Sequence, residues 1–273
     1  MQWFESTTAR RSFGRATGMS AIALPGVWCA ALVLLTLAGC GDEPVTGRPS
    51  PDGRPRTMHD AIRSGDISEV KTQLAISEVP LDLKGKDGPI LLAQAIEAEQ
   101  PAVVKLLVDE GVSPQCKDAE GKPLMFKAAM KSGDMVRAML TNGAPVDLRD
   151  NVGQTALHMA VGESKQDAVE ALIEAGIDVN AVDRSGLTAL HSGINADLTV
   201  LDLLRKHGAK VDTTDVRGST PLHKAAAAGN RKAIAWLLDA GANVNTKNTN
   251  GHTPLYLARP EVRDTLLKHG AKE

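Results

Sequence analysis

Two interleaved series of glycines divide most of this chain into units of 32 or 33 residues. The first series is Gly88, Gly121, Gly153, Gly186, Gly218 and Gly251, at successive intervals of 33, 32, 33, 32 and 33 residues. The second series is Gly111, Gly143, Gly176, Gly208 and Gly241. Glycine enters the left-handed backbone region that other residues avoid, so regularly spaced glycines indicate regularly spaced turns. The chain is therefore expected to repeat one small supersecondary unit.

The unit is clearest in residues 215–248. Thr220-Pro221 predicts a helix start, because the Thr side chain can cap free N–H groups and Pro suits the first helical position. Gly229 ends this helix, a second amphipathic run carries apolar residues on one face, and Gly241 marks the end of the second helix. Two short helices cannot bury their apolar faces alone, so neighbouring units must stack.

The period and the motifs resemble the ankyrin repeat. Segments similar to T-P-L-H begin at Thr155, Thr188, Thr220 and Thr253, and G-A-N-V-N at residues 241–245 supplies the family's tail. The resemblance covers residues 57–273. It implies an all-α ankyrin-repeat solenoid of helix-turn-helix units joined by β-hairpin-like turns, with about seven units of which the first and last are caps.

Individual units depart from this pattern. The second unit, residues 87–117, reads Pro89-Ile90-Leu91-Leu92 where T-P-L-H would stand, and Glu99-Gln100-Pro101 at the turn between its helices. The third unit has Phe126 at the His position. Units four to six are closest to the consensus, so we expect the most stable block in residues 150–248.

Residues 1–39 have the features of a lipoprotein signal peptide. Residues 10–15 hold three arginines, and the apolar run at residues 27–38 is too short for a bilayer that needs about 20 residues. Leu37-Ala38-Gly39-Cys40 follows this run and resembles a bacterial lipobox, whose Cys takes a diacylglyceryl group and becomes the N-terminus after cleavage. An uncleaved anchor with an incidental Cys is the alternative.

This reading predicts a location in the bacterial cell envelope. Acyl chains on Cys40 would hold the protein to a membrane, facing the periplasm, and residues 40–56 would be the lipidated Cys with a Pro- and Gly-rich tether. Gly41 after the Cys favours the outer over the inner membrane. Both the general secretory route and the twin-arginine route stay open, since Arg10-Arg11-Ser12-Phe13 matches part of the twin-arginine motif.

The sequence gives no indication of catalysis. His158, His191 and His223 occupy the T-P-L-H position, where the resemblance implies a hydrogen bond to the adjacent turn. The chain lacks metal-ligand spacings, nucleophile motifs and a strongly basic stripe, and Cys116 is the one Cys outside residues 1–40. We therefore expect no enzyme activity, no cofactor, no metal and no nucleic acid, and a monomer as the working form.

The resemblance instead predicts a protein-binding surface on the concave side, formed by the turn tips and first helices. Its candidate residues flank the opening glycines: Asn151, Val152, Gln154, Arg184, Ser185, Leu187, Val216, Arg217, Ser219, Thr249 and Asn250. A solvated face with no ligand is the plainer interpretation.

Three classes of function follow. A lipid-anchored periplasmic module would bind one protein, either as an immunity protein against a toxin that acts in the periplasm or as an accessory to a periplasmic enzyme such as catalase. An envelope assembly scaffold is the second class. A secreted effector directed at a host protein is the third, and an acylated Cys40 argues against it.

Overall fold

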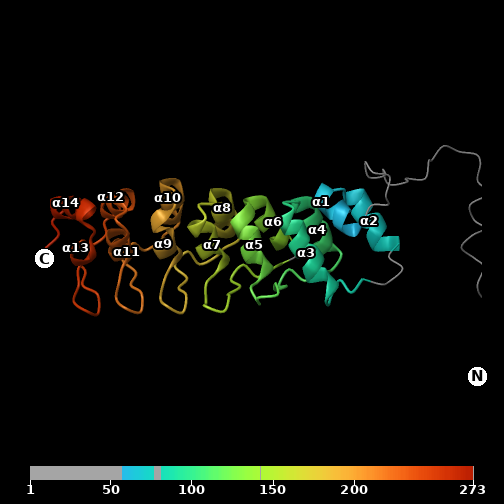
Figure 1. Cartoon of the computed structure of the whole chain (residues 1–273), viewed down its shortest axis with the longest axis horizontal. Coiled ribbons are helices and arrows are strands. Elements are labelled where there is room, and N and C mark those ends of the chain that lie inside the picture. The colour runs from blue at the N-terminus through green and yellow to red at the C-terminus, as the bar shows by residue number, and fades with distance from the viewer. Residues whose placement is uncertain (1–56, 77–80, 142, 273) are drawn as a thin grey trace, which may run out of the picture. The chain divides into compact units, whose positions relative to one another are not determined.

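The computed structural model describes residues 57–76, 81–141 and 143–272. The predicted signal peptide, Cys40 and the tether lie outside these residues. Helices alternate along the chain with short connections, and in Figure 1 they form two rows with the longer loops projecting on one side. The helices are α1 (Met58–Ser64), α2 (Ile67–Ile76), α3 (Asp87–Glu97), α4 (Pro101–Asp109), α5 (Leu124–Lys131), α6 (Gly133–Leu140), α7 (Ala156–Gly162), α8 (Gln166–Glu174), α9 (Ala189–Ser192), α10 (Leu198–Lys206), α11 (Pro221–Ala228), α12 (Arg231–Asp239), α13 (Pro254–Leu257) and α14 (Pro260–Lys268).

These helices form antiparallel pairs, and each pair packs mainly on the next pair along the chain. The first helix of one pair packs on the first helices of the pairs before and after it, as α5 does on α3 and α7. The second helices pack in the same way, as α6 does on α4 and α8. The expected all-helical ankyrin-type solenoid is confirmed. Isolated antiparallel bridges such as Arg149–Thr155 and Val182–Thr188 close the hairpin-like turns between pairs.

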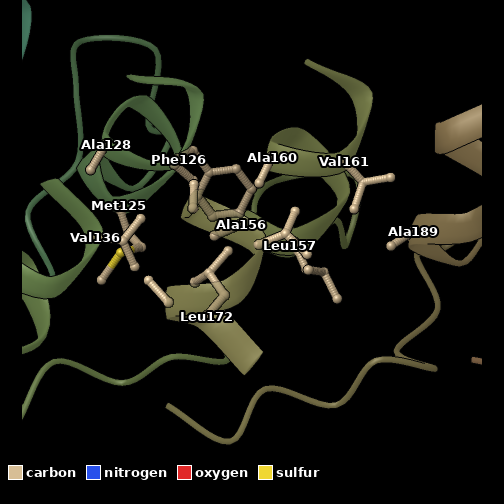
Figure 2. Packing of buried hydrophobic residues seen from close by; sticks show 14 of the residues in the cluster. Met125, Phe126, Ala128, Val136, Ala156, Leu157, Ala160, Val161, Leu172 and Ala189 are labelled. Carbon is tan, nitrogen blue, oxygen red and sulfur yellow. The ribbon is translucent and has the colours of Figure 1, made fainter. Parts of the chain in front are cut away.

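The core runs continuously between the pairs and is built from small and aliphatic side chains. Figure 2 shows Phe126 and Met125 of α5 beside Ala156 and Ala160 of α7, with Leu172 of α8 beneath them. All five side chains are buried. Alanines at the points of contact allow the first helices to approach closely, which is why the core needs few aromatic residues.

The T-P-L-H motif starts the first helix of the regular pairs. The backbone N–H of Thr155, Thr188 and Thr220 each donates to Nδ1 of the His three residues later, at 3.1 Å. The Thr hydroxyl oxygen lies 2.9 Å from the same nitrogen in all three units. A ring nitrogen therefore satisfies the orphan donor that a helix start exposes.

The glycine series behave as predicted with one exception. The opening glycines from Gly121 to Gly251 and the closing glycines from Gly111 to Gly241 all have φ between 69° and 99°, in the left-handed region. Gly88 does not open a turn. It lies buried within the first turn of α3, where an added Cβ would come 2.0 Å from the carbonyl oxygen of Leu83.

The register assigned to the second unit is therefore wrong by one residue. Leu92 is fully buried at the place of Leu222, so Ile90 takes the Thr position and Ala93 takes the His position of the motif. Residues 81–87 turn back tightly, with the Asp82 carbonyl accepting from the N–H groups of Gly85 and Asp87. This turn leaves the second unit without the projecting hairpin found in later units.

The fifth unit differs from the consensus more than its sequence suggested. Its first helix, α9, continues as a 3-10 turn at Gly193–Asn195 before α10 begins. Gly208 lies 22 residues after Gly186, as Gly143 does after Gly121, whereas Gly241 lies 23 residues after Gly218.

Candidate protein-binding surface

Five hairpins project from the array, and each is closed by its own first side chain. The hairpins are residues 118–122, 150–154, 183–187, 215–219 and 248–252. In the third of them, Asp183 Oδ1 accepts from the N–H groups of Ser185 at 2.7 Å and Leu187 at 2.9 Å. The equivalent oxygens of Asp118, Asp150, Asp215 and Asn248 accept the same pair of bonds.

These Asp and Asn residues are structural, a role that was not predicted from the sequence. The signal was present as D-x-x-G, with N-x-x-G in the last hairpin, ending at each opening glycine after Gly88. Asp and Asn side chains favour such turns because they bond to backbone N–H groups two residues further on. These hydrogen bonds fix the shape of the tip and leave the two residues before the glycine facing outward.

Neighbouring tips are joined by backbone hydrogen bonds. The N–H of Arg184 donates to Val152 O at 3.0 Å, and the N–H of Val216 donates to Ser185 O at 2.9 Å. The N–H and the hydroxyl of Thr249 both donate to Arg217 O, at 2.9 and 3.0 Å. The last four tips thus form one continuous row with a fixed spacing, hereafter the tip row.

The structure brings the predicted binding residues together on this row. Asn151, Val152, Arg184, Ser185, Val216, Arg217, Thr249 and Asn250 are exposed on it. Gln154, Leu187 and Ser219 are half-buried, and their backbone carbonyls bond within the array, so they are partly structural. Val152 is 53% exposed and Val216 is 68% exposed, so both valines offer apolar surface to a partner.

The tip row also carries positive charge on its exposed side chains. Arg184 and Arg217 are exposed beside the two valines, whereas the hairpin carboxylates of Asp183 and Asp215 are turned into their own loops by the bonds described above. Arg149, which was not among the predicted residues, bridges neighbouring turns by donating from Nη1 to the carbonyls of Gly153 at 2.8 Å and Val182 at 2.7 Å. Aliphatic and Arg side chains side by side suit a partner that offers apolar and acidic groups.

The three motif histidines tie each first helix to the next hairpin, as the resemblance implied. Nε2 of His158 lies 2.9 Å from Leu187 O, that of His191 lies 3.2 Å from Ser219 O, and that of His223 lies 3.1 Å from His252 O. Because Nδ1 accepts from the Thr N–H, Nε2 carries the proton and donates. Burial lowers the pKa of all three imidazoles, and the bond to the carbonyl opposes part of that shift.

The remaining features to consider are the free cysteine, possible metal ligands and possible membrane-spanning helices. Cys116 is half-buried and free, and burial raises the pKa of its thiol. Across residues 57–76, 81–141 and 143–272, His, Cys, Asp and Glu side chains form no group of three or more that could hold a metal ion. In the same residues, no helix has the length and apolar character needed to cross a membrane.

Comparison with known proteins identifies relatives for this array. The model of the family described as ankyrin repeats (3 copies) matches residues 58–150, 124–215 and 194–273. The mouse B-cell lymphoma 3 protein homolog is 34% identical over 196 residues, which span 67% of this chain and 43% of that protein. The Arabidopsis thaliana E3 ubiquitin-protein ligase KEG is 31% identical over 113 residues, 40% of this chain but 7% of that protein.

A solved structure agrees with these matches. The crystal structure of the ankyrin repeat domain of Bcl-3, a member of the IkappaB protein family, superposes with a TM-score of 0.67 at 31% identity. The match covers 78% of this chain and 98% of that domain. The chain therefore spans nearly all of a solved repeat domain, but less than half the length of either of these two relatives.

Proposed function

Because this chain belongs to the ankyrin-repeat family, whose arrays bind other proteins, we propose that it is a membrane-tethered module that binds one protein ligand through its tip row and first helices. The observation that carries the proposal is the tip row, where backbone hydrogen bonds fix the spacing of exposed side chains from Asn151 to Asn250. A surface held in place before binding loses little conformational entropy on association.

The chemistry of the row indicates where binding energy would come from. Val152 and Val216 are exposed apolar side chains, and Arg184 and Arg217 stand beside them. Arg is enriched among residues that dominate binding energy, and exposed apolar side chains gain most from being covered. The motif histidines, by contrast, are occupied in holding the repeats together, which supports a role in binding rather than in catalysis.

We further propose that acyl chains on Cys40 tether the array to a bacterial membrane on its periplasmic side, the outer membrane being favoured. This part rests on the Leu37-Ala38-Gly39-Cys40 motif, which lies outside the described residues. Two acyl chains are enough for stable anchoring. Within that setting, a one-to-one ligand is either a toxin that the array neutralises or an exported enzyme that it assists.

Replacing Cys40 with Ala is expected to abolish lipid labelling and membrane attachment, because no other residue of the motif carries a thiol. The measurement is incorporation of radioactive palmitate and fractionation of the producing bacteria. Cys116→Ala serves as the matched control and should leave both unchanged. Labelling that persists in Cys40→Ala would refute the proposed anchor without touching the binding proposal.

Photo-crosslinking tests the tip row directly. A photoreactive residue at position 216 in the full-length protein is expected to capture one protein at stoichiometric yield in its own cells. The control places the same residue at position 205, an exposed site on α10 in the other row of helices. Capture of a toxin encoded nearby or of an exported enzyme would assign the role. Equal capture of many envelope proteins from both positions would favour a scaffold and contradict the tip row.

A further inference from the structure

A groove of about 530 Å³ opens at the N-terminal end of the array, and none of the four hairpins of the tip row lines it. Side chains from α1, α3, α5 and the first hairpin surround it. The residues that matter for its chemistry are His59, Arg63, Ile90, Ala93, Gln94 and Lys117.

The groove exists because the second unit lacks two features of the regular units. Its hairpin is replaced by the tight turn at residues 81–87, so within residues 57–76 and 81–141 no hairpin tip equivalent to the later ones covers α1. Its His position is held by Ala93, so no imidazole reaches across to the carbonyl of Lys122, 29 residues later. His158 and His223 do reach the carbonyls that lie 29 residues after them.

His59 shows what the missing hairpin would have contacted. Counting back from the glycine that ends the helix, His59 stands six residues before Gly65, as His223 stands six before Gly229. His223 bonds to a hairpin carbonyl and is buried, whereas His59 is exposed and lines the groove. Ile90, at the Thr position, is 56% exposed where Thr220 is fully buried.

The polar groups of the groove favour an acidic ligand. Lys127 Nζ already lies 3.3 Å from Glu97 and 3.9 Å from Asp118, so both carboxylates in the lining share one amine. Arg63 and Lys117 add two further cations. Gln94 Oε1 is buried without a hydrogen-bond partner among the described residues, so this acceptor suits a backbone N–H of a bound peptide rather than its acidic side chains.

We propose that this groove receives an extended acidic segment of the protein ligand, which takes the place of the missing hairpin. A backbone carbonyl of the segment accepts from His59, an acidic side chain lies between Arg63 and Lys117, and an aliphatic side chain covers Ile90. The inference rests on the proposed binding function and adds a second contact region to it. The chain's own residues just before Thr57 suit the groove less well, because Arg54 and Arg56 are basic.

The test uses the full-length protein and a fluorescein-labelled peptide of sequence Glu-Val-Glu-Val-Asp-Glu, with fluorescence anisotropy as the readout. Binding is expected to weaken with salt and to vanish when Lys replaces every acidic residue of the peptide. Ala93→His fills the groove with the imidazole that regular units carry, so it should weaken binding at least about tenfold while leaving thermal stability equal or higher. Arg63→Glu should weaken binding by a similar factor. Ala227→His, the same change at an exposed site of α11, is the control and should leave binding unchanged.

Each contrary outcome overturns the inference. Absence of peptide binding at 1 mM (a limit of roughly −4 kcal/mol), or binding unaffected by Ala93→His, excludes the groove as the acidic-peptide site. A photoreactive residue at position 90 that captures only residues preceding Thr57, or only a second copy, assigns the groove to that occupant instead. Crosslinking from position 216 separates this failure from that of the binding proposal, because the tip row is intact in Ala93→His.

Discussion

Replacing Leu222 with Asp is expected to destabilise the C-terminal part of the array by at least about 4 kcal/mol. Leu222 is fully buried in α11 within the continuous core, and no Lys or Arg is among the buried residues of the described chain that could pair with a carboxylate there. Helix α11 contacts α9, α12 and α13. Each repeat is held only by its neighbours, so the damage should spread from α11 to the end of the chain and stop before the early units.

Urea unfolding and hydrogen exchange would measure this effect. Amides of residues 221–268 should lose protection while those of α5–α8 keep theirs. Val216→Asp adds the same charge at an exposed tip and should change stability by less than about 0.5 kcal/mol. A loss below about 1 kcal/mol for Leu222→Asp would mean that this side chain does not lie in the inter-repeat core.

Mild acid is expected to destabilise the array through His158, His191 and His223. Their pKa values are lowered in the folded state by burial, and Nδ1 of each accepts a backbone N–H, which a protonated ring cannot do. The unfolded chain, with an ordinary imidazole pKa near 6.5, binds protons first as the pH falls. Stability is therefore complete above about pH 6.5 and is lost as the pH falls from there toward the folded pKa values.

The slope that one histidine adds cannot exceed about 1.4 kcal/mol per pH unit, and it reaches that limit only where the unfolded chain binds the proton and the folded chain does not. Urea midpoints measured at intervals from pH 7.5 to 5.2 would record the slope, above the range where carboxylates titrate. His191→Gln should lower stability at all pH values and reduce the slope by about a third. His207→Gln, at an exposed helix end, is the control. A midpoint that does not change with pH would contradict the assigned protonation state.

The repeat fold could be predicted from sequence because its determinants are local. The left-handed glycines at fixed spacing and the Thr–His pairs that start α7, α9 and α11 are visible in the sequence, and both perform the expected roles in the structure. The hairpin carboxylates were equally visible as D-x-x-G but were not interpreted, since an acidic residue in a loop usually indicates no more than solvent exposure.

The second unit shows where local inference fails. Gly88 fits the spacing of the opening glycines, yet it serves a close backbone approach to Leu83 rather than a left-handed turn. Only the three-dimensional path of residues 81–87 separates these two uses of glycine. The groove beside Ala93 could not be predicted for the same reason, because it depends on a hairpin that is not formed there.

The hairpin design has a consequence for how this surface could change over evolutionary time. Asp183 and its counterparts close each loop from the loop's own first position, and backbone bonds, supported by the Arg149 guanidinium and the Thr249 hydroxyl, join one tip to the next. The side chains at Arg184, Ser185, Val216 and Arg217 therefore contribute almost nothing to folding. Mutations there can be sampled freely, so a lineage could acquire a new ligand without first losing a stable protein. Because folding and binding depend on different groups, these positions are also suitable for randomisation when a new binding specificity is to be engineered on the same scaffold.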